Sequence, residues 1–167
     1  LSSPLPYRRK KNQTVEDFCE ELVKEFEQKI EELGSENVAV FIAEPVLASG
    51  GCIVPPDGYF KKIYDVCKKN EIIFIADEVV TGFGRLGHFF SSEEIFGVVP
   101  DIITCAKGIT SGYLPLGAVL FSNKLITDLK NDSSLFFHGY TYSGHPACCA
   151  AALKNIEILQ RDKILEH

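Results

Sequence analysis

The chain has 167 residues, of which 46% are hydrophobic and 24% charged, and its formal net charge is −6. This composition is typical of a folded globular protein and excludes a disordered one. The negative charge argues against nucleic-acid binding, which needs clustered cations, and the basic run from Arg8 to Lys11 is interpreted as a solvated linker. Because no apolar run has the length of a transmembrane helix, no membrane partner is expected.

The six cysteines lie mostly in apolar segments, and their spacing matches no zinc-binding pattern. We interpret them as reduced thiols of an intracellular protein rather than as a disulfide framework. No metal site is expected at His138 and His145, because no set of ligands at metal-binding spacing accompanies them.

The first predicted helix follows a polar, proline-marked stretch, residues 1–13, that is typical of an extended connector. Thr14 and Asp17 have the spacing of a capping box. Apolar residues then recur every three or four positions as far as Leu33, which predicts one long amphipathic helix that ends at Gly34. Residues 1–36 are therefore predicted to be a connector and a helix.

Four short apolar runs further along the chain predict β-strands, at residues 38–43, 72–76, 102–105 and 116–121. Helices are expected after Pro56, near Ser92, near Ser122 and from Pro146. This alternation predicts an α/β fold whose mostly parallel sheet has helices on both faces. The connection before the last run is too short for a helical crossover, so one strand is predicted to be antiparallel.

Three of the apolar runs end at a charged residue, namely Glu44, Asp77 and Lys107. In an open α/β sheet, ligands bind beyond the carboxyl ends of the strands. We therefore expect these three side chains to face one crevice. The alternatives are solvent-exposed charges at strand ends, or a plain ion pair between the lysine and a carboxylate.

A lysine at a buried strand end has a specific chemical use. Burial favours the neutral amine, which can attack a carbonyl group and form a Schiff base. If that carbonyl belongs to pyridoxal phosphate, a carboxylate is needed beside the pyridine nitrogen, which it keeps protonated. Asp77 and Lys107 are therefore interpreted as parts of one catalytic device.

Three motifs occur in a specific order, namely IADEVVTGFGRLGHFF, PDIITCAKGITSGYLPLGAV and HGYTYSGHPACCAAAL. This set resembles the class III pyridoxal-phosphate-dependent aminotransferases, which belong to fold type I. The stretches GYLPLGAV and YTYSGHP are most similar to the omega-amino-acid:pyruvate subgroup. The resemblance begins at about Asn37, and it implies that residues 37–167 are the later part of the cofactor-binding large domain.

The resemblance also implies roles for individual residues. Lys107 would form the internal aldimine with pyridoxal 5'-phosphate and then move the substrate proton. Asp77 would pair with the pyridine nitrogen, and Val79 would pack against the ring. Thr141, with the backbone near Tyr140, would bind the cofactor phosphate of a neighbouring subunit, because family members share their sites across a homodimer.

Three further positions bear on how the substrate and the cofactor ring are bound. Glu44 would help to shape the substrate pocket. Val80 stands where some relatives carry a glutamine that reaches the ring hydroxyl, and a valine cannot make that hydrogen bond. Ser49 stands where the ornithine and 4-aminobutyrate enzymes carry a second glutamate, which argues against those two specificities.

The function that this resemblance implies is transfer of an amino group from an amine or omega-amino acid to a 2-oxo acid such as pyruvate. The alternatives are a PLP-dependent aminomutase or phospho-lyase of the same family, or a non-catalytic interaction fragment. Family members are much longer, and their upstream phosphate-binding loop and C-terminal small domain are not found in this sequence. We therefore interpret the chain as an internal fragment that is inactive alone, from a cytoplasmic or mitochondrial parent.

Overall fold

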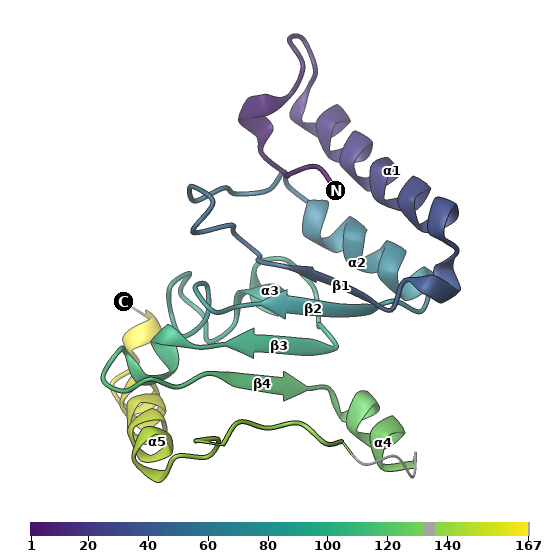
Figure 1. Cartoon of the computed structure of the whole chain (residues 1–167). Helices are drawn as coiled ribbons and strands as arrows, with labels where there is room; N and C mark the ends of the chain where they lie inside the picture. The colour runs from purple at the N-terminus through teal and green to yellow at the C-terminus, as the bar shows by residue number, and fades with distance from the viewer. Residues whose placement is uncertain (132–135, 167) are drawn as a thin grey trace.

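A four-stranded sheet forms the centre of the structure (Figure 1). The computed structural model describes residues 1–131 and 136–166. β1, β2 and β3 are parallel neighbours, and β4 pairs antiparallel with β3, which confirms the predicted mostly parallel sheet with one antiparallel strand. In spatial order the strands are β1 (Val40–Ala43), β2 (Ile73–Asp77), β3 (Ile102–Cys105) and β4 (Ala118–Phe121).

Helices lie at each position where the sequence predicts one. The α-helices are α1 (Val15–Leu33), α2 (Tyr59–Lys69), α3 (Ser91–Glu94), α4 (Asn123–Asn131) and α5 (Pro146–Arg161). Short 3-10 turns, which were not predicted, are η1 (Pro6–Arg8), η2 (Ser35–Asn37), η3 (Lys107–Thr110) and η4 (Ile164–Glu166). Among the described residues, none of the helices is both long enough and apolar enough to cross a membrane.

The long helix α1 begins as its sequence indicates. The Thr14 hydroxyl accepts a hydrogen bond of 3.0 Å from the backbone N–H of Asp17, and Gly34 follows the last turn with a φ of +81°. The apolar stripe of α1 faces α2 and the sheet, and its buried members are Cys19, Leu22, Val23, Phe26 and Ile30. Helix α1 therefore belongs to the same hydrophobic core as the strands.

The aromatic ring of Phe74 in β2 lies at the centre of that core. It contacts the rings of Phe41, Phe60 and Tyr64, with ring centroids 5.6, 5.1 and 5.5 Å away. A second, smaller cluster contains Cys105, which ends β3, together with Ile109 and Ala152, so that α5 packs against η3. Residues of α1 and α2 therefore pack against the sheet in one core, and α5 packs against η3.

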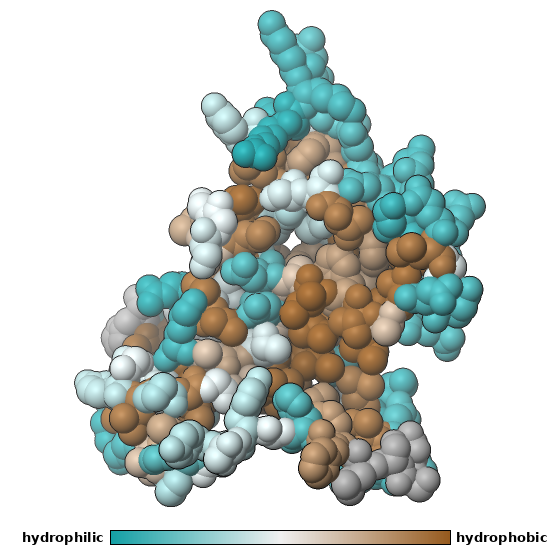
Figure 2. Space-filling view, viewed as in Figure 1, coloured by the Kyte–Doolittle hydropathy of each residue, from teal (hydrophilic) through white to brown (hydrophobic). Residues whose placement is uncertain are grey.

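The opposite face of the sheet carries exposed apolar side chains. Val40, Ile42 and Val119 are 43%, 57% and 55% exposed, and the pairing of the strands places them on the face away from α1 and α2. Figure 2 shows hydrophobic residues exposed over the strands. These three apolar side chains are therefore left uncovered by the described part of the chain.

Candidate active site

Asp77 is the last residue of β2, at the carboxyl edge of the sheet. In the sheet it is paired with Thr104 of the parallel strand β3, so the two side chains lie on the same face. Its Oδ1 atom accepts a hydrogen bond of 3.0 Å from the backbone N–H of Val79. This bond fixes the carboxylate, while Oδ2 has no hydrogen-bond partner among the described residues.

The hydroxyl of Thr104 is buried and, among the residues that the structure describes, finds no hydrogen-bond partner. A buried hydroxyl without a partner is unfavourable unless a ligand or solvent supplies one. Thr104 and Val79 line an open pocket of about 680 Å³, whose other lining residues include the start of β4 and residues 138–140 and 142–144. Sequence reasoning missed Thr104, because nothing in its local pattern distinguishes it from an ordinary strand residue.

Lys107 opens the 3-10 turn η3, two residues after the end of β3. The turn carries the side chain out of the core, so Lys107 is exposed rather than buried as the sequence indicated. Its backbone has a φ of +44°, which is uncommon for a residue other than glycine. No hydrogen bond or ion pair holds its Nζ atom among the described residues, so the ammonium group is free to meet a ligand.

The turn at Lys107 lies directly against the loop that follows Asp77. A side chain at Gly108 would place its Cβ 2.9 Å from the Cβ of Phe83 and 3.2 Å from the carbonyl oxygen of Gly82. Only a glycine therefore allows the loop after β2 and the turn after β3 to approach so closely. This contact links the segments that carry Asp77 and Lys107.

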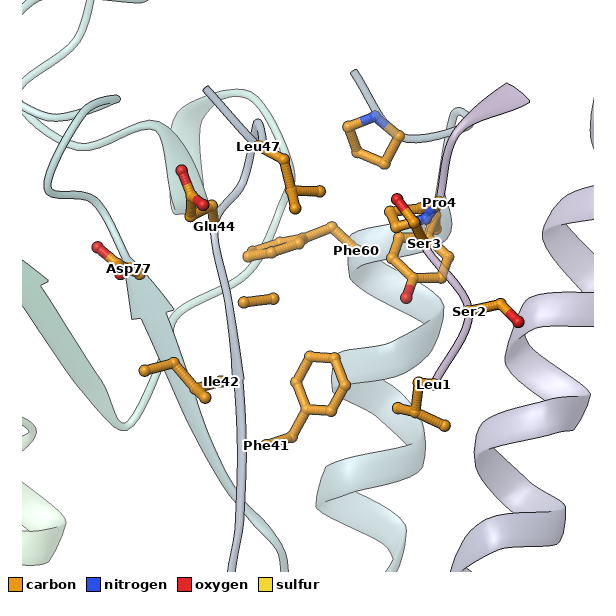
Figure 3. A pocket seen from close by; sticks show the side chains of 13 residues that line it. Leu1, Ser2, Ser3, Pro4, Phe41, Ile42, Glu44, Leu47, Phe60 and Asp77 are labelled. Atoms are coloured by element: carbon orange, nitrogen blue, oxygen red, sulfur yellow. The ribbon is translucent and has the colours of Figure 1, made fainter. Parts of the chain in front are cut away.

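Glu44 and Asp77 share another pocket, of about 470 Å³ (Figure 3). Figure 3 shows the two carboxylates at one end of this pocket, with residues 1–4 at the other end and Phe60 between them. One oxygen of Glu44 accepts a hydrogen bond of 3.1 Å from the backbone N–H of Ala48. The structure thus brings two of the three charged strand-end residues to one pocket, whereas Lys107 lines neither this pocket nor the one at Thr104.

Tyr140 lies near Val79, since both line the pocket of about 680 Å³. The backbone N–H of Tyr140 donates to the Ser143 hydroxyl at 3.0 Å, and its carbonyl accepts from the backbone N–H of Ser143 at 3.3 Å. Thr141, inside this turn, is exposed and is not part of the pocket wall. Its side chain therefore faces outward, where a ligand or another chain could meet it.

Glu78 is a second residue that sequence reasoning missed. Although charged, its side chain is completely buried. Its carboxylate accepts hydrogen bonds from the hydroxyls of Thr81 (2.6 Å), Ser91 (2.8 Å) and Ser92, and from the backbone N–H of Ser92 (2.7 Å). These bonds fix the loop between β2 and α3, whose near end carries Val79 and whose middle packs on Gly108.

The site contains no evident metal-binding cluster. Within residues 1–131 and 136–166, no three His, Cys, Asp or Glu side chains gather as metal ligands would. All six cysteines are free thiols, and Cys19, Cys67, Cys105 and Cys148 are buried.

Comparison with known proteins gives consistent matches over the whole chain. The family model described as "Aminotransferase class-III" matches residues 1–167, a match that begins well before Asn37. The putrescine–pyruvate aminotransferase of Pseudomonas aeruginosa is 45% identical over 166 residues, which are 99% of this chain and 36% of that protein. The mitochondrial gamma-aminobutyrate transaminase 1 of Oryza sativa subsp. indica is 43% identical over 158 residues, which are 93% of this chain and 30% of that protein.

Solved structures give the same result. A thermostable (S)-enantioselective omega-transaminase from Thermomicrobium roseum superposes with a TM-score of 0.94 and 49% sequence identity, covering 99% of this chain and 37% of that one. The chain thus spans about a third of the length of the relatives that it matches.

Proposed function

The chain belongs to the class III aminotransferases, and from this premise we propose that its parent protein is a pyridoxal-phosphate-dependent aminotransferase. It transfers an amino group from an amine or omega-amino acid to a 2-oxo acid such as pyruvate. The observation that carries the proposal is the placement of Asp77 and Lys107 at the same ends of neighbouring parallel strands, inside the region that the family model matches. The names of the relatives, one of them a putrescine–pyruvate aminotransferase, support amino transfer to pyruvate.

The residues present fit such a cofactor. The free oxygen of Asp77 and the unpartnered hydroxyl of Thr104 lie on the same face of the sheet, and the two residues line neighbouring pockets. A planar, polar ring with apolar faces would satisfy both groups, and Val79 offers it an apolar contact. Pyridoxal phosphate, when bound, supplies an electron sink for the substrate carbon.

Each residue of the chain then has a defined task. Asp77, oriented by the Val79 N–H, would accept a hydrogen bond from the protonated ring nitrogen and keep that proton in place. Lys107 would hold the cofactor through its amine and would then hold and move the proton of the substrate carbon. Glu44 closes the end of the neighbouring pocket beside Asp77, which we assign to the substrate.

We propose that Thr141, with the backbone at Tyr140, contacts the cofactor phosphate of a second subunit in a homodimer. The exposure of Thr141 supports this, because its side chain faces away from its own pocket wall. Large aromatic side chains next to it are also exposed, as expected of a surface that another chain covers, and they are Phe136, Phe137, Tyr140 and Tyr142.

The relatives also bear on the amino donor and on the compartment of the parent protein. Ser49 argues against 4-aminobutyrate as a donor, whereas a gamma-aminobutyrate transaminase is 43% identical to this chain, so 4-aminobutyrate is included among the donors to be tested. The cytoplasm or the mitochondrion is the proposed compartment, and a mitochondrial relative supports the second. The relatives named above are all transaminases, which supports amino transfer rather than a mutase, phospho-lyase or non-catalytic role.

A donor panel on the full-length protein tests the proposal. Putrescine, 4-aminobutyrate and 1-phenylethylamine are each supplied with pyruvate, and alanine formation is followed. We expect alanine from at least one donor, and a loss of about a hundred-fold in Asp77→Asn, which keeps the side-chain shape but removes the charge. Asp65→Asn, on the exposed face of α2, serves as the control. Phosphate release or isomerised substrate without alanine would instead indicate a lyase or a mutase.

A further inference from the structure

We propose that Asn155 of α5 is a positioning residue that holds the backbone turn carrying Lys107. The inference rests on the proposed function, in which Lys107 binds the cofactor. Asn155 lies 48 positions beyond Lys107 (155 − 107) and outside the segments to which the family resemblance assigns a role.

Asn155 uses both ends of its amide group on the turn. Its Nδ2 atom donates to the carbonyl oxygens of Gly108, at 2.9 Å, and Ile109, at 3.1 Å. Its Oδ1 atom accepts a hydrogen bond of 2.7 Å from the hydroxyl of Ser111. One side chain therefore binds three of the four residues that follow Lys107.

The turn needs such support because of its backbone conformation. Lys107 and Ser111 have φ values of +44° and +50°, in the left-handed region that side chains other than glycine rarely adopt. Strained residues of this kind persist only where the surrounding structure determines their conformation. The bonds from Asn155 act on the carbonyls between these two residues, where they oppose relaxation of the turn.

Two other contacts make the turn a rigid unit. Ala152, one helical turn before Asn155 on the same face of α5, packs against Ile109 and Cys105. On its other side, the turn lies at Gly108 against Phe83 and Gly82. The turn is thus held between α5 and the loop that follows Asp77.

The Lys107 side chain has no partner of its own among the described residues and is exposed. Its reach toward the cofactor is therefore set by where the backbone places its Cα atom. Displacing a reacting group by about 1 Å can lower a catalytic rate about a hundred-fold. A clamp on the main chain next to Lys107 should accordingly influence catalysis and not stability alone.

The test uses the full-length, cofactor-loaded protein. Asn155→Ala removes all three hydrogen bonds, and Ser111→Ala removes one of them. Lys154→Ala, at the preceding and exposed position of α5, removes only a surface pair with Glu157 and is the matched control. Single-turnover rates of the amine half-reaction are measured at a temperature where circular dichroism shows every variant folded, together with the pH titration of the bound cofactor's absorbance.

We expect Asn155→Ala to lower the maximal single-turnover rate about ten- to hundred-fold, with little change in the amine concentration that gives half of that rate and a moved midpoint of the absorbance titration. Lys154→Ala should behave as wild type. A lower melting temperature in Asn155→Ala with wild-type rate and titration would overturn the proposal, because a purely structural bond gives that result. If Asn155→Ala does not fold, Ser111→Ala decides, since a reduced rate supports the clamp and an unchanged rate refutes it.

Failure of the proposed function gives a different result. In that case Lys107→Ala would keep its covalent cofactor or its transaminase activity, whatever Asn155→Ala does. A cofactor bound through Lys107 with no effect of Asn155 would overturn the positioning role alone.

Discussion

Lys107 combines an exposed side chain with a constrained backbone. The sequence predicts that Lys107 follows directly after a strand, because an apolar run stops there and a glycine follows. It does not predict the positive φ or the exposure, since both depend on contacts with residues far away in the sequence. Gly82, Phe83 and Asn155, which contact the turn, come from two separate segments.

Gly108→Ala tests how closely the two active-site segments must approach. The added methyl group would lie 2.9 Å from the Cβ of Phe83, which cannot move away without its backbone. We expect the full-length protein to lose about 1–3 kcal/mol of unfolding free energy, as is usual for overpacking. Gly50→Ala is the control, because its methyl group would meet only ordinary contacts of 3.6 Å or more. Equal melting temperatures for the two variants would contradict this account.

At the scale of elements, the loop between β2 and α3 depends on one buried carboxylate. The sequence shows Glu78 beside Asp77 and suggests two similar residues at a strand end. The structure separates them, because the half-buried Asp77 keeps one oxygen free whereas Glu78 is fully buried and saturated with donors. Two of those donors, Ser91 and Ser92, lie 13 and 14 residues from Glu78, too far along the chain for a local pattern to reveal their role.

Glu78→Ala should destabilise the protein by about 3 kcal/mol or more, since it leaves a buried backbone N–H and buried hydroxyls without an acceptor. Glu78→Gln should cost about 1 kcal/mol, because the Ser and Thr hydroxyls can rotate to accept from its amide. Chemical denaturation of the full-length protein measures both. The critical result is which variant has the higher free energy of unfolding. A Gln variant less stable than the Ala variant would contradict the proposed role of the Glu78 hydrogen bonds.

Helix α2 carries a thiol whose ionisation is coupled to folding. Burial raises the pKa of Cys67 from 9.0 to about 12. The thiol is therefore protonated in the folded protein at pH values where the unfolded chain has lost its proton. Its contribution to stability is complete below about pH 9 and is lost as the pH rises towards 12.

Cys67→Ala should consequently flatten the fall of the melting temperature between pH 9 and 12, although it lowers the melting temperature at pH 7. The buried hydroxyl of Tyr59, whose pKa burial also raises to about 12, keeps part of the pH dependence in both proteins. Thermal melts across this range provide the comparison. Parallel curves for the two proteins would show that Cys67 does not titrate on unfolding.

At the scale of the whole molecule, the order and direction of the strands could be predicted from the sequence. Continuous apolar runs and the short connection before β4 are local signals, and the structure confirms what they indicate. The exposure of Val40, Ile42 and Val119 could not be predicted, since their apolar side chains suggest burial, and this chain spans about a third of its relatives' length. A crevice shared by Glu44, Asp77 and Lys107 was predicted by analogy between strand ends, and Glu44 and Asp77 line one pocket, which Lys107, at the start of η3, does not line.

The measurement that tests the central claim most directly is borohydride reduction of the full-length, cofactor-loaded protein, followed by peptide mapping. We predict that reduction fixes the cofactor on the peptide containing Lys107 and on no other lysine, and that Lys107→Ala yields no labelled peptide. Labelling of a different lysine, or an adduct of the same strength in Lys107→Ala, would contradict the assignment of Lys107 as the residue that binds the cofactor.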